Sequence, residues 1–218
     1  MTVLQVICDQ DQVRGPLNDL AILTESISVR ILFGLTGPPG CGKDAAADHL
    51  AEAHGFARVA FADPIRQAAL ILDPYIPGAG RLSDVVHQYG WTTAKTRWPE
   101  VRRILQLLGT ELGRQLHGQD VWVNRTFDRI DALPSDQPVV VSDCRFRNEA
   151  STLREHGGLV VRINRSTTAP DAVMDHASER ESAGLLPDYV LPNHSSLDEL
   201  HRRLDRLVTR FQNRRRHC

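Results

Sequence analysis

The chain has 218 residues, a length that suits one large domain with a substantial hydrophobic core. Its 26 Lys+Arg and 27 Asp+Glu give a formal net charge of -1, which argues against a general nucleic-acid binder. No apolar run approaches the length of a membrane span and no signal peptide is recognised, so we expect a soluble, cytoplasmic protein without membrane association. The four cysteines lie far apart without C-x-x-C spacing, which indicates neither a zinc site nor a disulfide framework.

Predicted strands and helices alternate along the chain from residue 31 onward. Apolar runs predict the strands, and the helical spacing of apolar residues, with capping or turn residues, predicts the helices. In chain order the predicted elements are strand 31–35, helix 45–52, strand 57–61, helix 65–72, helix 100–116, helix 121–132, strand 139–141, helix 148–156, strand 159–163, strand 189–191 and helix 196–210. This alternation predicts an α/β fold, a doubly wound parallel five-stranded sheet with its ligand at the carboxyl ends of the strands.

Two of these helices carry specific sequence signals. Helix 100–116 has one apolar face, formed by Val101, Ile104, Leu105, Leu108 and Leu112. The last helix is expected to begin at Ser196 as its N-cap, with Glu199 completing a capping box.

The most informative segment follows the first predicted strand. Residues 37–43, Gly-Pro-Pro-Gly-Cys-Gly-Lys, fit G-x-x-x-x-G-K, the loop that wraps the phosphates of a nucleotide. Its glycines allow positive φ and bring N–H groups close to phosphate oxygens, and the next helix presents its positive N-terminal end. Lys43 would reach the β- and γ-phosphates as a mobile point charge. The alternative, a Gly/Pro-rich turn, is disfavoured because a strand precedes the loop and a helix follows it.

Lysine is rare in this chain. Of the 26 Lys+Arg, only Lys43 and Lys95 are lysines. Because arginine is used almost everywhere else, the lysine at position 43 supports the phosphate-loop interpretation: a compact ammonium group suits the loop better than a rigid guanidinium group would.

A second set of polar residues follows the predicted strand 139–141. Asp143 stands where that strand ends, a usual position for a carboxylate that holds Mg²⁺ directly or through water. The alternative for Asp143 is a carboxylate that caps a turn. Arg145, on the same loop, could clamp phosphates bidentately or could be an ion-paired surface arginine.

Further candidates lie between the second and third predicted strands. Asp63-Pro64-Ile65-Arg66 opens a helix, and a helix N-terminus with a nearby guanidinium could bind a second phosphate-bearing substrate. Arg102 and Arg103 are neighbours on one helix, so at most one of them should face a cleft. Trp122 could stack on a base, although a buried core tryptophan is the more common outcome.

The ordered motifs resemble those of the bacteriophage-type deoxynucleoside monophosphate kinases, relatives of the nucleoside monophosphate kinases. They cover about residues 30 to 205, and the ordered set is more specific than the phosphate loop alone. The motifs are G-x-x-x-x-G-K-D at 37–44, F-A-D-P-[IL]-[KR] at 61–66, R-x-x-L-Q-x-L-G-T-E-x-G-R at 102–114, D-x-W-V at 120–123, D-x-R-F-x-N-E-A at 143–150, H-x-S-E at 176–179 and N-x-x-S-L-x-E-L at 193–200.

This resemblance implies transfer of the γ-phosphoryl group of ATP to a deoxynucleoside 5′-monophosphate, with Mg²⁺, giving a dNDP and ADP. The ATP-binding residues that it implies are Gly37, Gly40, Cys41, Gly42, Lys43, Asp44, Ala45, Arg165, Asn193 and Ser195. The substrate-binding residues that it implies are Pro64, Ile65, Arg66, Arg102, Gln106, Gly109, Thr110, Trp122, Asp143, Arg145, His176 and Glu179. The catalytic residues would be Lys43, Arg102, Asp143 and Arg145.

The resemblance also implies a domain organisation and a setting. Residues 1–29 would be an extension of unknown role before a P-loop kinase domain at 30–218. That domain would carry a monophosphate-binding helical insertion at about 62–132 and a lid at about 165–186. The setting would be deoxynucleotide biosynthesis of a bacteriophage, with small-molecule nucleotides as partners rather than nucleic acid, and a homodimer is left open.

Two positions depart from the usual patterns. Asp44 replaces the Ser/Thr of common phosphate loops, as the family tends to have it, and Ala45 replaces the threonine that follows in the family. We therefore expect Mg²⁺ at Asp44 and Asp143, held through water. Two rival functions stay open: another small-molecule P-loop kinase, such as a dephospho-coenzyme A or phosphomevalonate kinase, and a nucleotide-binding module without transfer activity.

Overall fold

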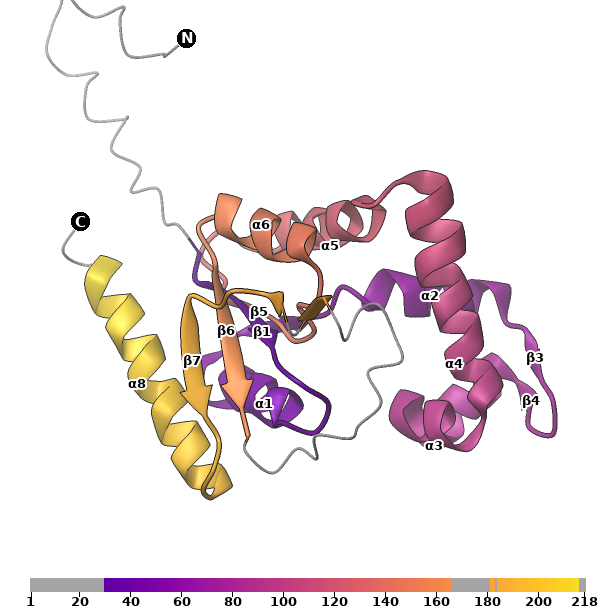
Figure 1. Ribbon diagram of the computed structural model, residues 1–218, viewed down its shortest axis with the longest axis horizontal. Coiled ribbons are helices and arrows are strands. Elements are labelled where there is room, and N and C mark those ends of the chain that lie inside the picture. The colour runs from indigo at the N-terminus through magenta and orange to yellow at the C-terminus, as the bar shows by residue number, and fades with distance from the viewer. Residues whose placement is uncertain (1–29, 166–180, 183, 216–218) are drawn as a thin grey trace, which may run out of the picture.

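The computed structural model describes residues 30–165, 181–182 and 184–215. Two layers of helices cover a central sheet, and a group of helices projects from one end of it (Figure 1). In chain order the elements are β1 Leu32–Thr36, α1 Lys43–His54, β2 Ala57–Val59, α2 Asp63–Leu72, β3 Tyr75–Ile76, β4 Gly80–Arg81, α3 Leu82–Arg97, α4 Pro99–Gln106, η2 Leu107–His117, α5 Val121–Asp131, β5 Val139–Val141, α6 Arg147–Glu155, β6 Leu159–Asn164, β7 Tyr189–Pro192 and α8 Leu197–Arg215.

The main sheet has five parallel strands in the order β2-β5-β1-β6-β7. All five strands predicted from apolar runs are present, and the doubly wound α/β fold is confirmed. Because β1 lies between β5 and β6, the loops that follow β1 and β5 leave the same edge of the sheet side by side. That edge, outside the carboxyl ends of the strands, is where open α/β sheets bind their ligands.

The central strand divides its side chains between two hydrophobic cores. Phe33 and Leu35 are buried with residues of α1 and α8, whereas Leu32 is buried with residues of α5 and α6. Gly34 lies between them, and a Cβ at this position would collide with Leu153 of α6. Successive side chains of β1 therefore point to opposite faces of the sheet and pack against both layers of helices. Because Gly34 has no side chain, α6 can approach the strand closely.

Between β2 and β5, the elements from α2 to η2 form a helical insertion with its own apolar core (Figure 1). That core consists of Ala69, Ile76, Leu82, Val85, Ala94, Val101 and Leu108. Helix α3 and the β3–β4 hairpin were not predicted from the sequence. Helix α3 contains Gly90 with φ 70°, which kinks it, so its sequence lacks a clean helical signal.

The prediction of a single α-helix at 100–116 is correct for its first part and wrong for its second. α4 continues into a π-helix, η2, whose wider turns shift the register of every later side chain. Val101 and Leu108 are buried as expected, but Leu112 is 46% exposed. The predicted apolar face therefore ends at about Leu108.

The last helix is longer than expected and is capped differently. Ser196 Oγ accepts a hydrogen bond from Glu199 N at 3.3 Å, as an N-cap should. The Glu199 carboxylate instead binds Arg202, Arg203 and Arg206, so the reciprocal half of the capping box is replaced by ion pairs.

Two further expectations meet limits of the described structure. Residues 1–29 and most of the expected lid lie outside the described residues. Within the part of the chain that the structure describes, no helix is both long enough and apolar enough to cross a bilayer.

Candidate active site

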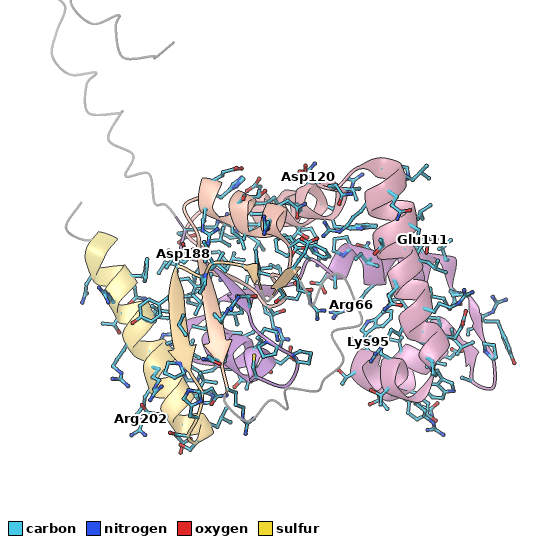
Figure 2. All side chains as sticks on the ribbon, viewed as in Figure 1. Arg66, Lys95, Glu111, Asp120, Asp188 and Arg202 are labelled. Atoms are coloured by element: carbon cyan, nitrogen blue, oxygen red, sulfur yellow. The ribbon has the colours of Figure 1, made fainter. Side chains whose placement is uncertain are left out.

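A cleft of about 770 Å³ lies where the carboxyl ends of β2 and β5 and the loop after β1 meet the helical insertion. Residues from the phosphate loop, from the segment after β2, from α3, from α4 and η2, and from the loop after β5 line it together. Figure 2 shows Arg66 and Lys95, two of these residues, at the junction between the sheet and the insertion. Five separate chain segments thus contribute to one concave surface.

The loop after β1 has the backbone that phosphate binding requires. Gly37, Gly40 and Gly42 have φ of 138°, 73° and 103°, a region that residues with a Cβ rarely adopt. Gly42 is the N-cap of α1 and no side chain caps that helix end, so its first N–H groups have no side-chain partner there. A Cβ at Gly37 would also meet Ile163 O at 2.5 Å. The glycines of the motif are therefore required by the backbone and by close packing.

Lys43 starts α1 and turns its ammonium group back over the loop. Its Nζ donates to Gly37 O at 2.7 Å and to Pro38 O at 2.8 Å, and lies 3.7 Å from Cys41 Sγ. Burial lowers the pKa of Lys43, and the nearby charge of Arg145 lowers it further, whereas Cys41 and Asp44 oppose these effects. The ammonium group is thus held in place and only partly hydrated.

Asp143 closes the other side of the cleft, directly after β5. Its Oδ1 accepts a hydrogen bond from Phe61 N at 2.7 Å, and its Oδ2 accepts one from Ala62 N at 3.1 Å. Burial raises the pKa of Asp143, while these two hydrogen bonds and the charges of Arg145 and Arg66 act in the opposite direction. Asp143 therefore joins β5 to the segment after β2, and each of its oxygens keeps a second lone pair.

Asp44 also lines the cleft, but its carboxylate has a protein partner. Arg58 of β2 forms ion pairs with Asp44 and with Asp48, one turn further along α1. The Asp44 side chain is 84% exposed, so this pair is well solvated.

Four cations gather in the cleft: Arg66, Lys95 and Arg102 from the helical insertion, and Arg145 from the loop after β5. Burial lowers the pKa of Lys95, and the positive charges of Arg66, Arg145 and Arg102 lower it further. Arg66 also donates to Asp63 Oδ1 at 3.0 Å, so one carboxylate offsets part of this charge. Such a group of like charges is stabilised by an anionic ligand. Lys95 was not a predicted site residue, although the rarity of lysine was a usable signal.

Arg102 and Arg103 separate as their neighbouring positions on a helix require. Arg102 lines the cleft, whereas Arg103 is 66% exposed and binds Glu100 one turn earlier. Only Arg102 can therefore contact a ligand in the cleft from this pair.

A buried ion pair holds the loop that carries Arg145. Arg114 Nη2 donates to Glu149 Oε1 at 2.8 Å, and both side chains are less than a tenth exposed. Glu149 Oε2 accepts hydrogen bonds from Arg145 N at 2.7 Å and from Phe146 N at 3.0 Å. The Arg114 guanidinium also lies 3.8 Å from the centre of the Phe146 ring. Arg114 and Glu149 both stand in the quoted motifs, but no sequence signal indicates that they pair.

The other predicted substrate residues divide into two sets. Ile65, Gln106, Gly109 and Thr110 line the cleft. Pro64 and Trp122 are not among the lining residues. The Trp122 indole Nε1 donates to Gly109 O at 2.8 Å, and its ring fills the space beside Gly113. Trp122 thus packs against η2 beside Gly109 and Gly113, and its contact with a base stays a prediction.

The predicted ATP residues outside the phosphate loop lie apart from the cleft lining. Asn193 is buried, and its Nδ2 donates to Cys41 O at 2.9 Å, so it supports the loop from below. Arg165 and Ser195 are exposed. Ala45 lies on α1, immediately after Asp44. His176 and Glu179 lie outside the described residues.

Comparison with known proteins gives consistent relatives. A family model described as deoxynucleotide monophosphate kinase matches residues 83–204. A protein of Acanthamoeba polyphaga mimivirus that is named as a deoxynucleotide monophosphate kinase is 32% identical over 189 residues, covering 78% of this chain and 92% of its own. A deoxynucleoside-5′-monophosphate kinase of Escherichia phage T5 is 43% identical over 56 residues, covering 25% of this chain and 21% of its own.

The chain also resembles solved structures at low sequence identity. A dephospho-CoA kinase from Campylobacter jejuni aligns with a TM-score of 0.46 and 13% identity, covering 84% of this chain and 97% of its own. A shikimate kinase from Acinetobacter baumannii aligns with a TM-score of 0.41 and 12% identity, covering 86% and 96%. These alignments are too distant to inform the site. The family model spans more than half of this chain, and the chain aligns with nearly the whole length of the mimivirus protein. The chain therefore belongs to the deoxynucleotide monophosphate kinase family.

Proposed function

We propose that this protein transfers the γ-phosphoryl group of ATP to the 5′-phosphate of a deoxynucleoside monophosphate, which gives a dNDP and ADP. One observation carries the proposal: a phosphate loop and a separate group of cations face the same cleft. Two phosphate-bearing molecules can therefore meet there with their phosphates adjacent, as an in-line displacement requires. Membership of the family supports the same reaction.

The donor is assigned to the loop after β1. The N–H groups of the glycine-rich loop and of the first turn of α1 can surround the β-phosphate, where the helix end is favourable for an anion. Lys43 is held by the carbonyl oxygens of Gly37 and Pro38, and its ammonium group can exchange these oxygens for those of a γ-phosphate.

The acceptor phosphate is assigned to Arg66, Lys95 and Arg102. All three line the cleft from the helical insertion, which in this proposal is the monophosphate-binding part of about 62–132. Arg145 lines the same cleft from the sheet side, between the phosphate loop and the helical insertion, so it can contact both phosphates. The attacking oxygen belongs to a phosphate and is already nucleophilic, so the protein needs to position and neutralise charge rather than supply a strong base.

The carboxylates fit a metal unequally. Each Asp143 oxygen retains a lone pair that can accept a hydrogen bond from a metal-bound water. The Asp44 carboxylate is paired with Arg58, and this ion pair would have to break before Asp44 could bind such a water. We therefore assign the main metal contact to Asp143, through water. Mg²⁺ bound there would neutralise charge on the phosphates.

The proposal includes a reducing, cytoplasmic setting. Cys41 is a free, fully buried thiol within the phosphate loop, 3.7 Å from Lys43 Nζ. Oxidation of this thiol would add atoms to a close-packed loop and obstruct phosphate binding.

The test is a turnover screen with MgATP as donor and each common dNMP and NMP as acceptor, read as ADP release. We expect rapid transfer to at least one deoxynucleoside monophosphate. Turnover with dephospho-coenzyme A or phosphomevalonate instead would assign the chain to another small-molecule kinase. Calorimetric ATP binding without turnover on any acceptor would leave it a nucleotide-binding module.

A further inference from the structure

The packing of α1 against α8 brings together two imidazoles and a carboxylate on the side of the sheet that α1 and α8 cover. His49 and His54 lie on α1, with His54 as its last residue, and Asp205 lies on α8. His49 Nε2 and His54 Nε2 each lie 2.7 Å from the same atom, Asp205 Oδ1. One ligand atom from each residue lies within 4.8 Å of the other two.

We propose that His49, His54 and Asp205 form a binding site for a divalent transition-metal ion of the zinc class. Two imidazole nitrogens and one carboxylate oxygen are a common ligand set for Zn²⁺, with a fourth position left for water. A tetrahedral zinc ion separates neighbouring N and O ligands by about 3.3 Å, given bonds of about 2.0–2.1 Å. The two N···O distances would therefore lengthen by roughly 0.6 Å, which side-chain rotation can supply.

The surroundings suit a cation that arrives from solvent. The side chains of His49, His54 and Asp205 are 14%, 21% and 44% exposed, so the rings are largely enclosed while the carboxylate stays accessible. His201 stacks on His49 at 3.9 Å between ring centres, with 9° between the planes, which fixes the orientation of the His49 ring. The site also lies at the C-terminal end of α1, where the helix dipole favours positive charge.

A metal ion here would join α1 to α8 at the end of α1 opposite Lys43. Both helices contribute to the same hydrophobic core, so ion binding would stabilise packing that already exists. Because the unfolded chain does not hold the three ligands together, the ion should raise the thermal midpoint of unfolding. The spacing of five residues between His49 and His54 is not a recognised metal motif, and only the tertiary structure supplies Asp205.

The test uses the full-length, untagged protein after treatment with a chelator, without nucleotide and with excess Mg²⁺ to occupy oxygen-rich sites. Calorimetry with Zn²⁺ should show one tight site, Co²⁺ should give the visible absorption of a tetrahedral complex, and Zn²⁺ should raise the melting temperature. His54→Gln and Asp205→Asn should each weaken Zn²⁺ binding at least about tenfold. His87→Gln, which changes an exposed histidine on α3, is the matched control and should bind as the native protein does.

Two results would overturn the proposal. One is the absence of a Zn²⁺ site or of a cobalt spectrum in the native protein, which would leave a hydrogen-bonded His–Asp–His cluster. The other is unchanged Zn²⁺ affinity in folded His54→Gln and His49→Gln, since both variants lose a ligand but keep Asp205. Circular dichroism of each variant without metal separates loss of the site from loss of the fold.

Discussion

In the proposed reaction, Lys43 neutralises charge on the transferred phosphoryl group. Replacing it by alanine should leave the fold intact and lower kcat at least about a hundredfold, because a preorganised charge is removed from the transition state. Initial rates at saturating substrates measure this effect, and thermal melting checks the fold. A folded Lys43→Ala variant with near-native kcat would contradict the assignment of the phosphate loop.

Arg102 and Arg103 provide a matched pair of substitutions. Arg102→Ala should raise the KM for the acceptor about tenfold to more than a hundredfold, since a charge-assisted bond is worth roughly 1.5–3 kcal/mol. ATP affinity, measured alone by calorimetry, should change little. Arg103 is exposed and pairs with Glu100, so Arg103→Ala should change the acceptor KM less than about twofold. Loss of ATP binding in Arg102→Ala, with acceptor affinity kept, would reverse the assignment of the two sites.

The contact between η2 and the start of α6 rests on Arg114 and Glu149. Burial, together with the charge of Asp143, raises the pKa of Glu149 from the ordinary 4.5 to about 7. Hydrogen bonds from Arg145 N and Phe146 N and the charge of Arg114 oppose this rise. The folded protein therefore binds this proton more tightly than the unfolded chain does. The resulting stabilisation is complete below about pH 4.5 and is lost as the pH rises through about 7.

Glu149→Gln removes this titration while keeping the shape of the side chain. Over about pH 5 to 8, the free energy of unfolding of the native protein should fall relative to that of the variant as the pH rises. Urea denaturation at several pH values measures both curves. Parallel curves, or a native protein that gains stability relative to the variant over this range, would contradict the expectation.

The strands could be predicted because each is a short, mainly apolar segment bounded by polar or turn residues. β5, for example, is three consecutive valines that are all buried. Helix α3 could not be predicted, because Gly90, Thr92 and Thr93 favour other conformations. Burial of Leu82, Val85 and Ala94 in the core of the insertion stabilises it. The π-helix was missed for a related reason: spacing along the chain does not distinguish i+4 from i+5 hydrogen bonding.

The residues of the candidate site also divide into those that the sequence could predict and those that it could not. Lys43 and Asp143 could be proposed as site residues because each stands in a local pattern with a known chemical role, and Arg102 because it stands in a motif of the family that the sequence resembles. Glu149 and Lys95 could not be assigned a role, since their importance comes from burial and from neighbours distant in sequence. For Trp122, stacking on a base and burial in the core both stayed open, because the sequence does not show which side of a wall a ring occupies.

Charge is distributed unevenly over the folded protein. The formal net charge is -1, yet seven Lys/Arg side chains and only four Asp/Glu side chains line the cleft. Attraction of a dianionic acceptor should therefore weaken with salt, so its KM should rise as KCl increases from about 0.05 to 0.5 M. Lys95→Gln should raise the KM at low salt and make this dependence shallower. An identical salt dependence in native protein and variant would show that Lys95 does not act on the acceptor.

Because of where the two lysines lie, reagents that modify lysine side chains should react with this protein in the cleft alone. Lys43 and Lys95 are the only lysines in the chain, and both line the cleft. Burial lowers the pKa of each, so each carries more free amine near neutral pH than an exposed lysine would. Apart from the α-amino group, an acylating reagent should therefore modify only the cleft. Peptide mass spectrometry should then show ATP protecting Lys43 and the monophosphate protecting Lys95, so that covalent labelling reports the occupancy of each site separately.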